Sequence, residues 1–393
     1  MPLLVFSLRR IVFTIAALAS RASLVSNTPP NESASTLALT QPLLLVLVPC
    51  RNDGASLPGL VECLLTNGYP HNCLRILLID DGSTDDSLAA MQRLAFSSPY
   101  VVRSLCLQAN HGKAAALNAG LNADPWGEIV AVYDADHRPQ PGALAALVAP
   151  FTDTRVGGAS GRTEASNALA SPSAYYSAVE RMVHQRLTMV AKDRLQLAPA
   201  LLGSHCTYRR SLLDALGGFA PGAFLEDSDL TIRIAAAGYR TRYVERAPAF
   251  DHVPATLRAF WRQHVRWSRG FQDVAAGHSG RLLRHQLPFP LRLELLLFSL
   301  GYLDRLALLA AAALLLSDAL LHTQFGFPAW LLIAVLALPY LQVVAVFWRT
   351  RQPTAWWLRL PYLFFLFPVD LLVAVRSTLD TLLNRPRTWT PMR

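Results

Sequence analysis

Residues 74–86 read Leu-Arg-Ile-Leu-Leu-Ile-Asp-Asp-Gly-Ser-Thr-Asp-Asp, and this stretch decides the fold that the chain is expected to adopt. An apolar run ends in two carboxylates, after which Gly82 permits a tight turn into a helical stretch near Asp85–Ala95. This order is typical of a buried strand that turns into a covering helix. Taken alone, the carboxylates fit a ligand site and a plain connection equally well, since Asp85 could cap the helix.

The same strand–turn–helix order recurs on both sides of this stretch. The chain carries four short apolar runs bounded by turn residues, at Leu43–Val48, Arg75–Ile79, Val101–Leu107 and Ile129–Tyr133. Helical stretches lie between the runs, near Leu57–Leu65, Asp85–Ala95 and Lys113–Ala119. Such alternation predicts parallel βαβ units in a doubly wound α/β sheet, in which ligands bind at the carboxyl ends of the strands.

The net charge of +9 is unevenly distributed along the chain. Residues 1–40 carry +2, residues 41–250 carry −1 and residues 251–393 carry +8. A basic surface beside apolar segments suits an anionic bilayer face. The basic residues form no lysine-rich run and no aromatic-interleaved patch, which argues against nucleic acid as a partner.

Cysteines and histidines exclude two further classes of site. The five cysteines are widely spaced and form no CxxC pair, so we expect reduced thiols in a cytoplasmic domain rather than disulfides or a zinc site. The ten histidines form no HxxxH-type pair backed by an acid, and no transition-metal site is indicated.

The first 40 residues are ambiguous. Leu3–Leu8 and Ile11–Ala19 are apolar, but Arg9 and Arg10 divide them into pieces too short to span a bilayer. An interfacial helix, a decayed signal and a start site upstream of the real one all fit this pattern. Ser26–Ser35 is rich in Pro, Ser and Asn and is predicted to be a linker.

The last third of the chain is apolar enough to interact with a membrane. Leu306–Leu321 and Ala329–Phe347 are each long enough to cross one. Leu360–Val375 is short and contains residues that fit a continuous span poorly, namely Pro361, Pro368 and Asp370. We therefore expect this third segment to be re-entrant or to lie in the inner interface.

Polar residues follow the first two apolar runs. Pro49, Arg51 and Asn52 follow the first, and Asp80 and Asp81 follow the second. The carboxyl ends of parallel strands meet at one edge of a sheet, so these residues should lie near one another. A carboxylate there can accept hydrogen bonds from a ribose or a uracil ring.

Asp134 and Asp136 follow the fourth apolar run. Alternate residues of an extended strand face the same way, so both carboxylates should point together while Ala135 points back. Oxygen-only ligands favour Mg²⁺ or Mn²⁺, which usually bridge to substrate phosphates. Lys113, at the start of the third helical stretch, could reach a nucleotide or could be a solvated surface residue.

Glu226 and Asp227 precede a short helical stretch closed by Gly238. Asp227 is a candidate general base for an acceptor hydroxyl. The alternative is structural, because Asp227 or Ser228 could simply cap the helix.

Gln263, Arg266 and Trp267 are spaced i, i+3, i+4 and share one face of a predicted helix. An amide, a guanidinium and an indole together could bind a sugar, a diphosphate and a sugar-ring face. An amphipathic helix with arginines reaching to the membrane surface is the alternative.

These motifs, in this order, resemble those of the processive-type family 2 glycosyltransferases, which include cellulose, hyaluronan, chitin and poly-N-acetylglucosamine synthases. The resemblance covers about residues 41–393, and its main motifs are Asp80-Asp81-Gly82, Asp134-Ala135-Asp136, Glu226-Asp227 and Gln263-His264-Val265-Arg266-Trp267. The lesser matches are Gly112-Lys113-Ala114, Gly217-Gly218-Phe219 and Arg387-Thr388-Trp389-Thr390.

The resemblance implies a GT-A fold (a Rossmann-like, doubly wound mixed sheet), a UDP-sugar donor, Mg²⁺ or Mn²⁺, and inversion to a β-linkage. It places the uridine on Asp80 and Asp81, and the diphosphate and metal on Asp134 and Asp136. The other implied donor contacts are Pro49, Arg51, Asn52, Lys113, Gln263 and Arg266.

For catalysis, the resemblance makes Asp227 the base, with Glu226 supporting it, and assigns Trp267 and Trp389 to the acceptor. It also divides the chain into an N-terminal apolar or interfacial segment with a linker (1–40), a GT-A domain (41–250), amphipathic interface helices with QxxRW (251–300), and a transmembrane region with a cytoplasmic tail (301–393). The enzyme is thus expected in the inner cell membrane, multi-pass, with its catalytic domain in the cytoplasm.

Charge around the apolar segments supports this orientation. The loop His322–Pro328 carries no Lys or Arg and suits the outer face, whereas Arg349, Arg351 and Arg359 suit the cytoplasmic face.

The chain departs from the polymer synthases in having at best a remnant of a helix before the catalytic domain and few segments after it. A polymer channel built by one chain is therefore doubtful. The readings left open are polysaccharide synthesis, transfer of one sugar to a lipid, and a non-catalytic nucleotide-sugar-binding subunit.

Overall fold

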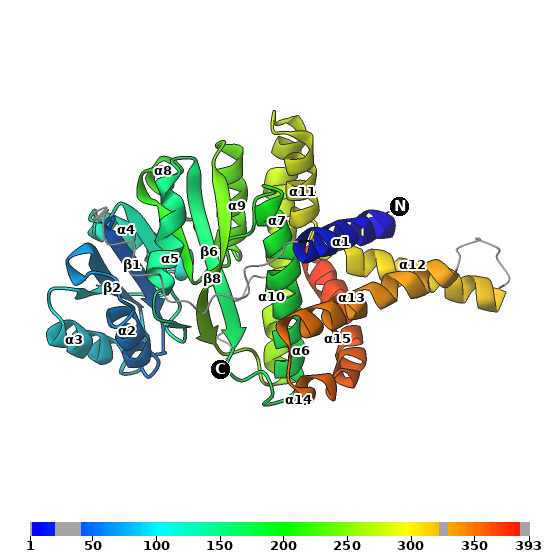
Figure 1. Cartoon of the computed structure of the whole chain (residues 1–393), viewed down its shortest axis with the longest axis horizontal. Helices are drawn as coiled ribbons and strands as arrows, with labels where there is room; N and C mark the ends of the chain where they lie inside the picture. The colour runs from blue at the N-terminus through cyan, green and yellow to red at the C-terminus, as the bar shows by residue number, and fades with distance from the viewer. Residues whose placement is uncertain (1, 20–40, 322–328, 386–393) are drawn as a thin grey trace.

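The computed structural model describes residues 2–19, 41–321 and 329–385. Its centre is an eight-stranded sheet in the order β3-β2-β1-β4-β7-β6-β8-β5 (Figure 1). The first four strands in the chain are parallel: β1 (Leu44–Cys50), β2 (Leu74–Asp81), β3 (Val102–Leu107) and β4 (Ile129–Val132). These strands confirm the predicted parallel βαβ units, which make up one half of the sheet.

The other half of the sheet makes it mixed. β7 (Cys206–Arg209) runs antiparallel to β4 and to β6 (Val156–Ala165), whereas β6 runs parallel to β8 (Arg240–Asp251). The two-residue β5 (Arg138–Pro139) closes the edge against β8.

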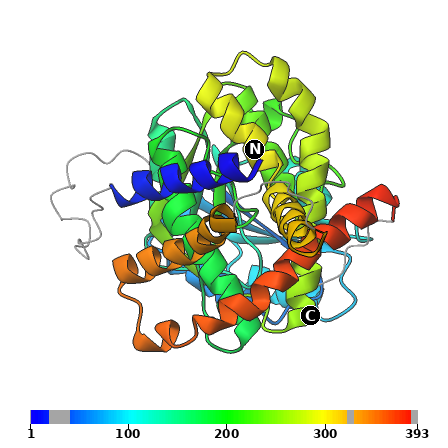
Figure 2. The same ribbon diagram turned by 90° about the vertical axis from the view of Figure 1, so that its right-hand side faces the viewer.

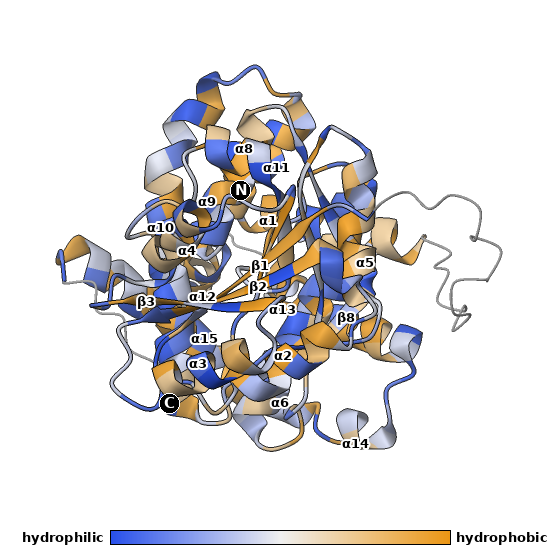
Figure 3. Ribbon diagram, turned by 90° about the vertical axis from the view of Figure 1, so that its left-hand side faces the viewer, coloured by the Kyte–Doolittle hydropathy of each residue, from blue (hydrophilic) through white to orange (hydrophobic). Residues whose placement is uncertain are grey.

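Side chains of β1 alternate between two separate cores. Val46 and Val48 belong to a core covered by α2 (Leu57–Leu65), whereas Leu45 and Leu47 belong to one covered by α4 (Lys113–Ala123). Both faces of the strand are therefore buried, as in a doubly wound sheet. Figure 3 shows β1 and β2 as hydrophobic ribbons in the middle of this domain.

The remaining helices complete the sheet domain and the region beside it. Those packed on the sheet domain are α3 (Ser87–Ser97), α5 (Ala143–Val148), α8 (Arg210–Ala215) and α9 (Glu226–Ala236). Those beside it are α6 (Pro172–Val183), α7 (Val190–Arg194), α10 (Leu257–Arg284), α11 (Phe289–Ser299), α12 (Leu303–Leu321), α13 (Ala329–Thr350), α14 (Thr354–Trp357) and α15 (Pro361–Leu382). A π-helical turn, η4 (His184–Met189), joins α6 to α7.

The N-terminal apolar residues form one continuous helix, α1 (Pro2–Leu18), which packs against η4, α7, α12 and α13. Arg9 and Arg10 do not divide it, because each has a carboxylate partner in the helical region. Arg9 binds Glu294 through two bonds of 2.7 Å, and Arg10 binds Asp304 at 3.0 Å. The predicted linker, Ser26–Ser35, lies outside the described residues.

Among the residues that the structure describes, two helices could cross a membrane by length and composition, Trp330–Thr350 and Pro361–Leu382. Phe289–Ser299 and Leu303–Leu320 qualify only together, as a pair bent by 70°. This differs from the expectation that Leu306–Leu321 spans by itself. Figures 1 and 2 show α15 crossing α12 rather than running alongside it.

The expectation that Leu360–Val375 is short and interrupted is wrong. α15 is continuous over 22 residues, because Pro361 occupies its first position, where a missing N–H costs nothing. Pro368 lies inside the helix, and Asp370 is buried with an ion pair to Arg305 at 2.8 Å.

Candidate active site

A cavity of about 1210 Å³ opens at the carboxyl ends of β1 and β4 and extends between α1, α6, α10, α12, α13 and α15. Most of the predicted site residues line it, although they come from segments far apart in the sequence. They are Pro49, Arg51, Asn52, Lys113, Asp134, Asp136, Glu226, Asp227, Gln263, Arg266 and Trp267.

Lys113 begins α4 and lies in the cavity wall rather than on a solvated surface. Its Nζ donates to Asp134 Oδ1 at 2.7 Å and to the Gly203 carbonyl at 2.8 Å, and lies 3.6 Å from Glu226. Burial lowers the pKa of Lys113, but the carboxylates, Asp134 first, raise it above its ordinary value. Lys113 therefore stays charged and links the two predicted acidic motifs.

Asp134 and Asp136 line the same cavity, but not as residues of an extended strand. β4 ends at Val132, and the Asp134 carbonyl accepts from the His137 amide at 3.1 Å, which makes a turn. Ala135 nevertheless points back into the core, as predicted. The two carboxylates therefore reach one cavity as predicted, although a turn after β4, and not an extended strand, places them there.

The imidazole of His137 keeps Asp136 ionised. Burial raises the pKa of Asp136, but the hydrogen bond from His137 at 3.3 Å and the charge of that ring lower it overall. His137 Nε2 also lies 3.9 Å from Asp251, which forms an ion pair with Arg181. Sequence analysis missed this trio; only the position of His137 next to Asp136 was a signal.

A divalent cation fits Asp134 and Asp136 only with further ligands. Over residues 2–19, 41–321 and 329–385, no three His, Cys, Asp or Glu side chains are grouped to hold a metal. Asp134 Oδ2 makes no hydrogen bond within the described structure, and Asp136 is held ionised. Two hard carboxylates with open positions suit Mg²⁺ or Mn²⁺ whose coordination is completed by phosphate oxygens and water.

Asp227 has the proton affinity of a general base. It is the second residue of α9, and Leu225 takes the N-cap position, so Asp227 is not the helix cap. Burial first, and the neighbouring Glu226 second, raise the pKa of Asp227 to about 7, although Lys113 acts in the opposite direction. A base of this pKa suits proton transfer near neutral pH.

Gly203 allows Lys113, Glu226 and Asp227 to lie close together. No sequence pattern indicated this role of Gly203. Its φ of +73° is in the left-handed region, and a Cβ there would lie 2.9 Å from Asp227 Oδ2. The same residue offers its carbonyl to Lys113. Any larger side chain would displace the carboxylate or the loop.

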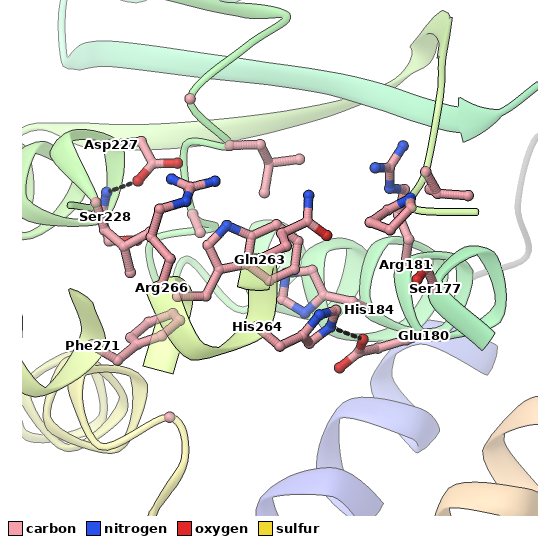
Figure 4. A pocket seen from close by; sticks show the side chains of 18 of the residues that line it. Ser177, Glu180, Arg181, His184, Asp227, Ser228, Gln263, His264, Arg266 and Phe271 are labelled. Atoms are coloured by element: carbon pink, nitrogen blue, oxygen red, sulfur yellow. Dashed lines mark hydrogen bonds and ion pairs between the residues drawn. The ribbon is translucent and has the colours of Figure 1, made fainter. Parts of the chain in front are cut away.

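The predicted face of α10 points into the cavity. Figure 4 shows the Arg266 guanidinium beside Asp227, with the Gln263 side chain pointing into the same cavity farther from Asp227. His264, between them, stacks on Phe260 with ring centroids 3.8 Å apart and binds Glu180 at 3.0 Å. Trp267 lines the cavity and packs against the helical cores.

Asp80 and Asp81 do not line the cavity. They are the last residues of β2 and are buried. Asp81 accepts from the amides of His111 and Gly112 at 2.8 and 2.9 Å and so holds the loop before Lys113. Asp80 accepts from the Ser83 amide at 3.2 Å. Their contact with uridine stays a prediction, and Trp389 lies outside the described residues.

Residues 41–270 match the family model for "Glycosyltransferase like family 2". The chain belongs to glycosyltransferase family 2. It is therefore a glycosyltransferase, and the reading as a non-catalytic subunit is set aside. The match shows the family and not the processive group within it.

Curated relatives of this family 2 glycosyltransferase have several names. The probable glycosyltransferase YdaM of Bacillus subtilis is 27% identical over 304 residues, covering 74% of this chain and 70% of YdaM. An N-acetylglucosaminyltransferase of Bradyrhizobium diazoefficiens is 30% identical, covering 79% and 64%. The β-monoglucosyldiacylglycerol synthase of Synechocystis is 27% identical, covering 62% and 50%. The chain thus spans one half to about two thirds of these proteins.

A solved structure shares the fold over nearly the whole length of both chains. The mannosyltransferase PcManGT from Pyrobaculum calidifontis, solved with GDP-Man and Mn²⁺, covers 97% of this chain and 99% of its own, with a TM-score of 0.65 and 22% identity. The GT-A-like fold with a mixed sheet is confirmed.

Proposed function

We propose that this glycosyltransferase moves a single sugar from a nucleotide diphosphate sugar to a lipid acceptor at the membrane, with inversion at the anomeric carbon. One observation carries the proposal: the cavity that holds Asp134 and Asp227 continues without a break between the apolar helices α12, α13 and α15. At about 1210 Å³ it exceeds the range of about 300–1,000 Å³ typical of sites for one small ligand.

At the sheet edge, the chain would hold the donor. The loops after β1 and β4 would carry the nucleotide and diphosphate, and Arg266 would grip phosphate oxygens from α10. Asp134 and Asp136 would hold Mg²⁺ or Mn²⁺, which would neutralise charge on the departing diphosphate. The complex of PcManGT with GDP-Man and Mn²⁺ supports a donor and cation of this kind.

In the reaction, Asp227 would take the proton of the acceptor oxygen as that oxygen attacks the anomeric carbon. Lys113 and Glu226 would keep the proton affinity of Asp227 near neutrality. Direct displacement from the face opposite the diphosphate inverts the configuration, which gives a β-linkage from an α-linked donor.

The size of the product tests the proposal. Membranes containing the enzyme are incubated with labelled UDP-sugars and, because the solved neighbour binds GDP-Man, with labelled GDP-mannose. We expect one discrete, solvent-extractable glycolipid with one donor. A ladder of water-soluble oligomers would instead support the polysaccharide reading.

A further inference from the structure

The half of the cavity away from the sheet has an apolar wall, and it is called the membrane half below. Its lining includes Leu3 and Phe6 of α1, Leu308 of α12, Val335 and Leu336 of α13, and Phe367 of α15. Charged residues of α1, α6, α12 and α15 line the same cavity, and we call them the charged belt. Those of α6 connect the sheet to the helical region, because Arg181 pairs with Asp251 of β8 and Glu180 pairs with Arg305 of α12. An acceptor that enters from the lipid therefore brings its reacting group past charged side chains.

The cations of the belt are already neutralised. Arg9 binds Glu294, Arg10 binds Asp304, and Arg181 binds Asp251. Arg305 binds Asp370 at 2.8 Å, Asp304 at 3.1 Å and Glu180 at 3.4 Å.

Among the arginines and lysines that line the cavity, two lack a carboxylate partner within the described part of the chain, Arg51 and Arg266. Arg51 follows β1, at the edge proposed for the nucleotide, and Arg266 faces Asp227. The donor diphosphate would use both. No unpaired arginine or lysine then remains among the described lining residues for a second phosphate, whose burial without a partner is costly.

The sheet end of the cavity would also repel an anionic acceptor. Glu226 and Asp227 lie there with Asp134, Asp136 and Asp251. Asp227, whose pKa is raised to about 7, can act as a general base only on a nucleophile that still carries a proton.

We propose that the acceptor of this enzyme is a lipid that reacts through an uncharged hydroxyl group, and not a lipid phosphate. This rests on the proposed function. The hydroxyl oxygen forms a bond to the anomeric carbon, and the bond from that carbon to the donor phosphate oxygen breaks. The electron pair leaves with the nucleoside diphosphate, and the hydroxyl proton passes to Asp227.

Matched acceptor pairs test the inference with the full chain in phosphatidylcholine vesicles. Diacylglycerol is compared with phosphatidic acid of the same acyl chains, and a polyprenol with its monophosphate. We expect transfer to one of the alcohols to exceed transfer to its phosphate by at least about tenfold, since a buried phosphate would be unpaired. Equal or faster transfer to a phosphate would overturn the inference and leave the proposed function intact. Transfer only to soluble sugars would overturn both.

A pair of variants on α13 locates the acceptor. Leu336 lines the membrane half, whereas Ile333, on the same helix, is 66% exposed and does not line the cavity. In Leu336→Trp, we expect the ratio of lipid glycosylation to donor hydrolysis to fall by about tenfold or more, because the acceptor is displaced from the anomeric carbon. Ile333→Trp should keep the ratio of the unchanged enzyme. An equal fall in both variants would show that the lipid does not occupy this half.

Discussion

At the scale of single residues, Lys113 interacts with both acidic motifs of the proposed catalytic site. It contacts Asp134 directly and stabilises the negative charge of that carboxylate. It also lies near Glu226 and lowers the pKa of Asp227, against the effect of burial. Asp227 is left able to exchange a proton near neutral pH, whereas His137 holds Asp136 ionised. The two carboxylate sites are thereby suited to different tasks, proton transfer and cation binding.

Asp227→Asn should bind the donor but lose about 10²–10⁴-fold in transfer rate, the usual contribution of a general base. The unchanged enzyme should lose activity as the pH falls through about 7, because the base is then protonated. Rates from pH 5 to 9 check both points. Near-normal transfer by Asp227→Asn would show that Asp227 is not the base.

Asp136→Ala should abolish transfer without changing the melting temperature, and EDTA should do the same to the unchanged enzyme. The reason is that Asp136 supplies one of two hard carboxylates for Mg²⁺ or Mn²⁺. Transfer assays with each cation added back provide the measurement. Full activity of Asp136→Ala in excess EDTA would remove the cation from the mechanism.

Arg266→Lys should cost far more activity than Arg262→Lys. Lysine keeps the charge of Arg266 but loses the planar fork that can bind two phosphate oxygens. Arg262 is the matched control, because it lies on the same helix and does not line the cavity. Steady-state kinetics at varied donor concentration compare the two variants. Equal losses of activity would indicate that Arg262 and Arg266 both have only a general role at the membrane interface.

At the scale of elements, the sequence predicted well where local pattern decides the structure. β1 to β4 were recognisable because each is a short apolar run between turn residues. β5 to β8 were not predicted, because a polar strand such as β8 is defined by its pairing with β6, not by its own pattern. Likewise, nothing near Asp370 indicates that Arg305, 65 residues away, allows α15 to continue. The site motifs could be recognised in the sequence. The roles of Gly203 and of the trio of His137, Asp251 and Arg181 could not, because they depend on contacts between residues far apart in the chain.

The attachment of α1 to the helical region predicts a change in stability. Glu294 is buried and accepts from both Arg9 and Lys192, so Glu294→Gln leaves two cations short of a partner. We expect a loss of about 3–5 kcal/mol in the free energy of unfolding. Thermal unfolding in detergent measures it. Arg155→Ala, which breaks an exposed pair with Asp153, should change nothing measurable.

At the scale of the whole molecule, the arrangement of α12, α13 and α15 suggests how the enzyme sits in a membrane. We propose that α13 crosses the bilayer, that the bent pair of α11 and α12 forms the other arm of the hairpin, and that α15, which crosses α12, lies along the inner interface (Figure 2). α15 is long enough to span, but Asp370 and Asp380 are buried along it, and the face carrying Asp370 contacts Arg305. Such a helix suits an interface against the protein better than lipid on all sides.

A reporter fused after Arg393 decides this topology. If α15 crossed fully, Arg376 near its end and the tail with Arg385, Arg387 and Arg393 would lie toward the outside, against the positive-inside bias. We therefore expect green fluorescence from a fused fluorescent protein and no activity from fused alkaline phosphatase. Active phosphatase would mean a third complete crossing.

The docking of α1 also has a consequence for biogenesis. Its arginines find their partners 285 and 294 residues later in the chain, and Gln342 of α13 binds Thr14 across 328 residues. The sheet, which ends at Asp251, can fold during synthesis long before those partners leave the ribosome. α1 can pack on η4 and α7 as soon as they fold, but its two arginines lack these carboxylate partners until the helical region has been made. The cavity proposed for the acceptor therefore forms only after α12, α13 and α15 have been made, and a chain that stops before α12 would have a folded sheet domain without that cavity.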